Sequence, residues 1–232
     1  MSNEDLEIAT ERAGDVRLRV LDLFCGLGGW SRPLRDRGHD VTTLDYLPRF
    51  AADHVRDIRE VVSLDELEQG RGRFDVVVAS PPCETFSVAA MWRHWTRRGN
   101  SYSIKTAAAQ RGLAIMDRTF ALIERYRPDF YVIENPRGMM RKVAPRLPNH
   151  TVWYCKLGDQ RAKPTDLWTN LRVRFPSICR NSNPACDHLR AARGTHAGTQ
   201  GLPKDARALI PYGLGLTVAL AAEFLTAARS SR

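Results

Sequence analysis

Residues 74–83 read FDVVVASPPC, a buried strand that ends abruptly at two prolines. The first six residues are mostly apolar and β-branched, which is typical of a strand inside a parallel sheet. Two consecutive prolines can neither continue such a strand nor enter a helix interior, so the chain must leave the sheet there. Cys83 therefore follows the carboxyl end of a strand, at the edge where open α/β sheets bind ligands. Taken alone, it is equally consistent with a small buried side chain at a turn.

Strand-like and helical patterns alternate on both sides of this stretch. Strands separated by helical segments predict an α/β fold with a doubly wound, mostly parallel sheet. The expected strands cover residues 16–23, 40–44, 74–79 and 129–133, the expected helices lie at about 30–37, from the second strand to about 55, at 105–126 and at 210–228, and residues 151–155 and 167–173 are expected to form a closing hairpin.

The chain is long enough for one α/β domain and a small appendage, with 232 residues of which 43% are hydrophobic. We expect a flexible N-terminal tail over residues 1–16, a main domain over 17–175 with 207–230, and a small irregular insert over 176–206. The N-terminal residues are polar rather than typical of a signal peptide, and we expect no apolar run to approach the ~20 residues that span a bilayer. These features predict a cytoplasmic protein without a membrane partner.

The formal net charge of +9 favours a polyanionic partner, most simply nucleic acid. A basic protein without such a partner is the alternative. The basic residues are concentrated just beyond two expected strand ends, where chemistry is also expected, and this position favours phosphate contacts. They are Arg93, Arg97, Arg98, Lys105 and Arg111 after Cys83, and Arg137, Arg141, Lys142 and Arg146 after the next strand.

Five cysteines without an export signal indicate reduced thiols rather than disulfides, which leaves Cys83 free to act as a nucleophile. Three further soft ligands, Cys179, Cys186 and His188, lie in the insert. With Cys155 or His196 as a fourth ligand they could bind one zinc ion and stabilise a segment too small for a core. Their spacing is not that of a standard zinc finger, so ordinary free cysteines are the alternative.

Three other motifs follow expected strands. Residues 22–29, DLFCGLGG, form a glycine-rich turn of the kind that admits a nucleotide-like cofactor. Asp45 and Tyr46 stand about where a ribose is bound and a purine stacked. Asp57 could meet an adenine amine, and Glu134 could bind or protonate a substrate ring beside Cys83.

The order DLFCGLGG, DY, DI, SPPC and ENP resembles the DNA cytosine-5 methyltransferases, in a compact phage or prokaryotic form, over most of residues 17–175. The resemblance implies a Rossmann-like fold, S-adenosylmethionine as cofactor and cytosine in DNA as substrate. It implies that the Cys83 thiolate adds to carbon 6 of the base, that Glu134 holds the ring nitrogen and amine, and that Arg161 contacts the carbonyl oxygen. The cofactor site implied in the same way comprises Phe24, Gly26, Gly28, Asp45, Tyr46, Asp57, Ile58 and Pro81.

A base inside a duplex must be flipped out before such an attack. The long segment after Cys83 matches the family's mobile loop, in which Trp92, His94 and Trp95 could fill the gap in the base stack. The phosphate contacts expected there come from Arg93, Arg97 and Arg98. The alternative for the tryptophans is ordinary packing under a helix.

The chain departs from the family pattern in three places. The second arginine of the family motif is replaced by Lys163, followed by Pro164, so either Arg161 or Lys163 could touch the base. The final motif lacks the usual Gly-Asn. The insert is short, so we expect the enzyme to recognise a very short DNA sequence or almost none. We also expect it to be a monomer.

Other functions remain open from the sequence alone. The same framework could modify RNA, or could transfer a modified group from a variant cofactor, for which Arg32 beside the glycine turn is the candidate cation. A non-enzymatic DNA-binding protein is disfavoured because Cys83 and Glu134 are both present.

Overall fold

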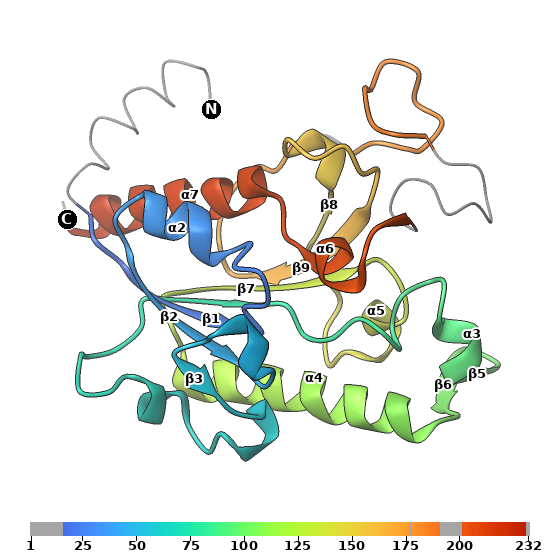
Figure 1. The fold of residues 1–232 in the computed structure, drawn as a ribbon, viewed down its shortest axis with the longest axis horizontal. Helices are drawn as coiled ribbons and strands as arrows, with labels where there is room; N and C mark the ends of the chain where they lie inside the picture. Colours follow the sequence, from blue (N-terminus) through green and yellow to red (C-terminus); the bar gives the residue numbers. More distant parts are fainter. Residues whose placement is uncertain (1–15, 177, 191–200, 231–232) are drawn as a thin grey trace.

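The computed structural model describes residues 16–176, 178–190 and 201–230. One seven-stranded sheet forms the centre, in the order β3-β2-β1-β4-β7-β9-β8 (Figure 1). The first five strands in that order are parallel, and β9 runs antiparallel to both β7 and β8. The strands are β1 Arg19–Leu23, β2 Asp40–Asp45, β3 His54–Val55, β4 Val76–Ala79, β7 Phe130–Pro136, β8 His150–Trp153 and β9 Pro164–Thr169.

Helices cover both faces of the sheet, so the predicted doubly wound architecture is confirmed (Figure 1). Helix α4 (Ala107–Tyr126) buries Met116, Phe120 and Ile123 against one face. Helices α2 (Ser31–Asp36) and α7 (Tyr212–Ser230) pack together on the other face. The smaller elements are η2 Pro48–Phe50, η3 Ile58–Glu60, η4 Leu64–Leu67, α3 Met91–His94, β5 Trp95–Arg98, β6 Ser101–Ile104, α5 Met140–Val143, η5 Tyr154–Lys156 and α6 Lys204–Ala208.

Two element predictions differ from the structure. The helix expected between β2 and residue 55 is only the single turn η2, which ends at Ala51 with a positive φ of 49°. The chain then forms β3, which pairs with the end of β2. Strand β7 continues beyond Ile133, because Glu134, Asn135 and Pro136 pair with the antiparallel strand β9.

Helix α7 is the C-terminal anchor of the core. Glu223 on this helix is fully buried, 2.9 Å from Nε2 of His39 and bound by Arg37. Within the described residues, Lys204–Ser230 is the one stretch long and apolar enough to cross a membrane. Its apolar side chains, among them Leu214 and Val218, pack into the core with α2, which is how the core helix of a globular domain behaves.

The predicted division into tail, main domain and insert stays a prediction. Residues 1–15 of the tail and residues 191–200 of the insert, His196 included, lie outside the described part of the chain. The described part of the insert contributes two buried residues, Cys179 and Cys186, to a small separate cluster with Trp153.

Candidate active site

The Ser80–Cys83 loop leaves the sheet beside the end of β7. Strands β4 and β7 are parallel neighbours with Ala79 opposite Ile133, so the residues after each strand end reach the same edge. The amide of Asn135 donates a 2.9 Å hydrogen bond to the carbonyl of Pro81 and ties the two ends together. On the other side, Nε1 of Trp30 donates to Oγ of Ser80 at 2.9 Å. The loop is therefore fixed in place between α2 and β7.

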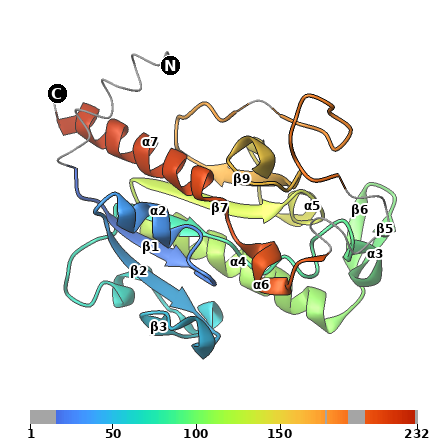
Figure 2. The same cartoon turned by 45° about the horizontal axis from the view of Figure 1, so that its top comes forward.

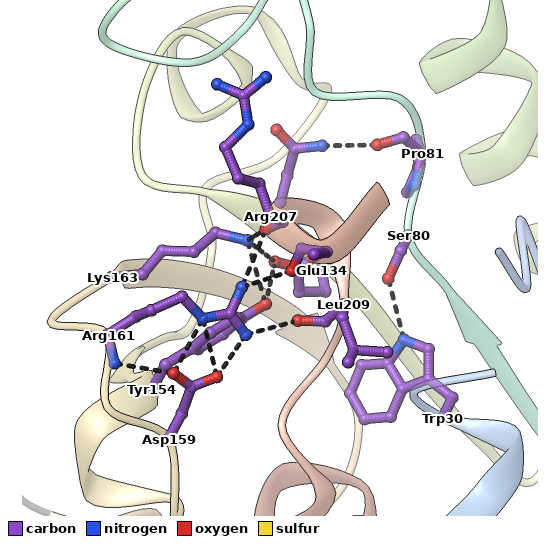
Figure 3. A network of polar contacts seen from close by, with 12 residues as sticks. Trp30, Ser80, Pro81, Glu134, Tyr154, Asp159, Arg161, Lys163, Arg207 and Leu209 are labelled. Carbon is purple, nitrogen blue, oxygen red and sulfur yellow. Dashed lines mark hydrogen bonds and ion pairs between the residues drawn. The ribbon is translucent and has the colours of Figure 1, made fainter. Parts of the chain in front are cut away.

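Glu134 is buried within hydrogen-bond reach of this loop, with 3% of its surface exposed. The hydroxyl of Tyr154 donates to Oε1 of Glu134 at 2.9 Å, and Nζ of Lys163 lies 4.0 Å from the same oxygen (Figure 3). Burial raises the pKa of Glu134, which Lys163, Tyr154 and Ser80 partly oppose. The protonated acid is thus more stable here than in water, and a protonated carboxyl can donate a hydrogen bond.

The thiol of Cys83 shares this pocket. Burial raises the pKa of Cys83, Lys163 is the cation that lowers it, and Glu134 raises it further. The thiolate is the reactive form of cysteine. Lys163 therefore favours the nucleophilic thiolate of Cys83. We call the site formed by Cys83, Glu134, Tyr154 and Lys163 the Cys83–Glu134 pocket.

The guanidinium of Arg161 is bound by other groups of the protein. Its guanidinium binds Asp159, with Nε 2.8 Å from both carboxylate oxygens, and donates to the carbonyls of Ala206, Arg207 and Leu209 (Figure 3). All three guanidinium nitrogens are therefore occupied, and only 7% of the residue is exposed. Arg161 is therefore held by the chain, whereas Lys163 is the cation beside Glu134, and which of the two touches the base stays a prediction.

Residues 153–163, which we call the wall segment, carry both cations close to one aromatic ring. The Arg161 guanidinium lies 5.2 Å and Nζ of Lys163 4.5 Å from the ring centroid of Tyr154. Lys163 also lies 3.4 Å from the Tyr154 hydroxyl and 3.2 Å from the Arg207 carbonyl. Tyr154 was missed from the sequence, because nothing local to β8 indicates that its hydroxyl reaches Glu134.

Helix α6 lies across the same edge of the sheet (Figure 2). Lys204 forms an ion pair with Glu84, the residue after Cys83. Asp205 binds Arg49 after β2 at 2.9 Å, and the last turn of α6 accepts the hydrogen bonds of Arg161. This short helix therefore connects the loop of Cys83, the end of β2 and the wall segment.

The glycine turn follows β1 at the same edge. Phe24, Gly26 and Gly28 all have positive φ, of 64°, 51° and 74°, which folds the chain back on itself. A Cβ added at Gly26 or Gly28 would meet no atom closer than 3.9 Å, whereas one at Gly29 would lie 2.7 Å from the backbone nitrogen of Ile210. The first two glycines are thus favoured by their positive φ rather than by crowding, and the third permits close packing against Ile210, just before α7.

The other expected cofactor residues lie along the ends of β2 and β3. Asp45 is buried and accepts hydrogen bonds from the backbone N–H groups of Gly26 (3.1 Å) and Leu47 (2.9 Å), so it shapes the turn. Tyr46 is exposed. Asp57 caps η3 and is paired with Arg59, which lowers the pKa of Asp57, although burial opposes this. Ile58 is buried in the core rather than open to a ligand, and Pro81 is buried beside Asn135.

The segment after Cys83 forms α3 and the β5–β6 hairpin, which project at the end of the sheet away from both termini (Figures 1 and 2). Arg93, Arg97 and Arg98 are exposed on it, as expected for phosphate contacts. Trp95 is a correction: it is 5% exposed, its indole donates to the carbonyl of Thr85 at 2.8 Å, and it packs on Phe86. Trp92, by contrast, is 65% exposed.

A separate group of soft ligands lies on the far side of the wall segment. One ligand atom from each of Cys155, Cys179, Cys186 and His188 lies within 4.8 Å of the other three. We call these four residues the Cys/His cluster. The structure thus joins the three predicted insert residues with Cys155, one of the two predicted candidates for the fourth position.

Comparison with known proteins agrees with the motif pattern. A family model described as C-5 cytosine-specific DNA methylase matches residues 18–152, more than half of the chain. A probable DNA (cytosine-5)-methyltransferase of Frog virus 3 is 29% identical over 203 residues, which cover 83% of this chain and 92% of that protein. The type II methyltransferase M.AplI of Arthrospira platensis is 32% identical over 129 residues, covering 54% of this chain and 33% of that enzyme.

Solved structures with a similar arrangement include a putative DNA modification methyltransferase of an E. coli prophage and the Dnmt2 methyltransferase of S. pombe. Both have a TM-score of 0.45, with 15% and 16% identity. The matches cover 66% and 70% of this chain, but only 46% and 52% of those chains. The chain therefore spans most of the viral relative, a third of the type II enzyme and about half of the solved structures.

Proposed function

This chain belongs to the C-5 cytosine-specific DNA methylase family, and from that premise we propose that it transfers a methyl group from S-adenosylmethionine to carbon 5 of cytosine in DNA. The observation that best supports the proposal is the Cys83–Glu134 pocket. It combines a thiol nucleophile, a buried carboxyl and one cation at the ends of neighbouring parallel strands.

The glycine turn fits the cofactor. Gly26 and Gly28 fold the turn tightly through their positive φ, and Asp45 holds the turn in shape through its bond to the Gly26 N–H. Phe24, Tyr46, Asp57, Ile58 and Pro81 complete the proposed site, with Ile58 contributing backbone rather than an exposed side chain. When bound there, S-adenosylmethionine supplies an electrophilic methyl group.

Cys83 begins the reaction on the base. Its thiolate adds to carbon 6 of cytosine, and the displaced electron pair makes carbon 5 nucleophilic. After carbon 5 has gained the methyl group and lost its proton, the electron pair returns and expels the thiolate of Cys83. The protein is thereby regenerated with no net change in its own atoms.

Glu134 and Lys163 stabilise the charge that develops on the ring. Burial raises the pKa of Glu134, which makes protonation of this carboxyl easier than in water, and in its protonated form it would donate to the ring nitrogen as Cys83 adds. Lys163 contacts the carbonyl oxygen of the base in this proposal, because its Nζ lies 4.0 Å from Glu134, whereas the Arg161 guanidinium is paired with Asp159 and bound to three carbonyls. Arg161 is accordingly a positioning residue that holds the wall segment.

The substrate is proposed to be a cytosine flipped out of duplex DNA. Arg93, Arg97 and Arg98 would bind phosphates, and exposed Trp92 would fill the gap in the base stack. We further propose a monomer that acts in the cytoplasm of a bacterial or phage-infected cell. The second predicted cofactor, a zinc ion, depends on the Cys/His cluster and not on this pocket.

Covalent trapping tests the proposal. Duplex DNA containing 5-fluorocytosine should form a stable adduct with the wild-type protein in the presence of S-adenosylmethionine, because fluorine cannot leave as the proton does. Cys83→Ala should form none while keeping the wild-type midpoint temperature of unfolding. Mass spectrometry of DNA and RNA from cells that express the protein identifies the product. Absence of any carbon-5 modification in both nucleic acids would refute the proposal, and a group larger than methyl would refute the stated cofactor.

A further inference from the structure

The Cys/His cluster has a ligand geometry that the proposed methyl transfer does not use. Its four ligand atoms lie within 4.8 Å of one another, and Sγ of Cys179 is 3.9 Å from Nδ1 of His188. Tetrahedral zinc, at about 2.3 Å from sulfur and about 2.0 Å from nitrogen, requires ligands close to this spacing. We propose that the cluster binds one zinc ion, and that this ion fastens residues 178–190 of the insert to the wall segment.

The imidazole of His188 is already oriented for a metal. Its Nε2 lies 2.9 Å from the carbonyl oxygen of Asn181. A carbonyl only accepts hydrogen bonds, so Nε2 must be the protonated nitrogen. The lone pair is then on Nδ1, which faces Cys179. A ring nitrogen bonded to a backbone carbonyl while the other faces the metal is the usual arrangement of histidine ligands.

The surroundings of the thiols suit bound thiolates better than free cysteines in a core. The amide of Asn183 points at Sγ of Cys179 from 3.6 Å, as a donor to sulfur. The guanidinium of Arg190 donates to the carbonyl of Cys186 at 2.8 Å. The only well-buried apolar side chain packed with the two buried cysteines, within the described residues, is Trp153. A segment with so little apolar core needs another source of stability, such as a metal ion.

The donor set selects the kind of ion. Three thiol sulfurs and one imidazole are soft to intermediate ligands, which bind zinc well and bind magnesium or calcium poorly. The cluster also supplies four protein ligands, the number found in closed structural zinc sites, so no position is left open for a catalytic water. The site is therefore structural and separate from the methyl-transfer chemistry.

The position of Cys155 gives the ion its role. Cys155 belongs to the wall segment and directly follows Tyr154, whose hydroxyl holds Glu134. The other three ligands belong to the insert. A second contact joins the same two parts, because the N–H of Leu189 donates to the carbonyl of Gln160 at 2.8 Å, next to Arg161. Bound zinc at Cys155 and the Leu189–Gln160 hydrogen bond would thus together fasten the insert to both ends of residues 155–160, a consequence for activity that rests on the proposed function.

Metal analysis tests the site independently of activity. Protein purified without chelator should contain one zinc ion per chain, and cobalt substitution should give the thiolate-to-cobalt charge-transfer band of a tetrahedral site. Cys179→Ser and His188→Ala should each lose the bound metal, whereas Cys25→Ser, which changes a buried cysteine elsewhere, should retain it. Wild-type protein that contains no zinc and shows no cobalt band would overturn the proposal.

Chelation of the wild-type holoprotein tests the fastening role. Removal of zinc should lower the midpoint temperature of unfolding and slow adduct formation on 5-fluorocytosine DNA, and added zinc should restore both, while S-adenosylmethionine binding persists. Unchanged midpoint and adduct rate after complete zinc removal would overturn the fastening role. If wild-type protein forms no adduct on any DNA, methyl transfer fails as the function, while the zinc content and the zinc-dependent midpoint still decide the site.

Discussion

Replacing Lys163 with methionine removes one positive charge from the Cys83–Glu134 pocket while keeping a side chain of similar length. Lys163 is largely buried, and its Nζ lies 4.0 Å from Oε1 of Glu134. At that distance, and with an effective dielectric constant of about 20, a unit charge pair interacts by about 4 kcal/mol. Loss of a comparable interaction with the charge that develops on the base should slow the reaction about 10²–10³-fold, as loss of one hydrogen-bond donor to an oxyanion does.

The pH dependence separates this electrostatic role from simple damage to the fold. Because Lys163 lowers the pKa of Cys83 against the effect of burial, its removal raises that pKa further. The rising limb of adduct formation on 5-fluorocytosine DNA should therefore move to higher pH in Lys163→Met. Lys163→Arg keeps the charge and should keep the limb near its wild-type position.

Measurement of adduct rates across pH, with the midpoint temperature of each variant, decides the matter. Arg161→Met is the matched comparison: loss of its bonds to Asp159 and to α6 should lower the midpoint temperature and leave the position of the limb unchanged. The reasoning is refuted if folded Lys163→Met reacts at the wild-type rate, or if only Arg161→Met moves the limb.

Three further predictions concern other parts of the fold. Glu223→Gln should lower the free energy of unfolding by about 3–5 kcal/mol in denaturant titrations. Burial alone would raise the pKa of Glu223, but bonds from His39 and Arg37 lower it, so the wild-type contribution should be complete above its ordinary pKa and be lost as pH falls through the lowered value; equal stability of both proteins at neutral pH would contradict this. Trp92→Ala should weaken DNA binding in anisotropy titrations without changing the midpoint temperature, whereas Trp95→Ala should cost about 3–5 kcal/mol of stability, and the reverse pattern would exchange their roles. Gly138→Ala should slow adduct formation but leave cofactor binding intact, because the new Cβ would overlap the carbonyl oxygen of Phe86 beside the Cys83 loop; an unchanged rate would show that the loop tolerates the shift.

The sheet and the meeting of Cys83 with Glu134 could be predicted because both depend on local sequence. An apolar strand followed by Pro81 and Pro82 must end there, and a second strand before Glu134 ends at the same edge if the two are parallel. The edge strand β3 could not be predicted in this way. Its two residues carry little local signal and are in strand conformation because they pair with β2.

The choice between Arg161 and Lys163 depends on contacts far apart in the chain. The bonds of Arg161 to Ala206, Arg207 and Leu209 join residues more than forty positions apart. Asp159 is close to Arg161 in sequence. The sequence alone does not show whether Arg161 pairs with Asp159 or with a substrate. Trp95 poses the same difficulty, since only the fold of the hairpin decides which tryptophan is buried.

The departures from the family pattern can be explained together by the structure of the wall segment. Tyr154 holds Glu134, Arg161 binds α6, and Lys163 places its positive charge beside Glu134. A full-sized insert could hold such a wall in place through its own core, but the described residues 178–190 bury almost no apolar surface. Cys155 offers a different solution, because one metal bond at this position would join the insert directly to the residue after Tyr154. The proposed metal site would thus let a short insert keep the wall segment rigid beside Glu134.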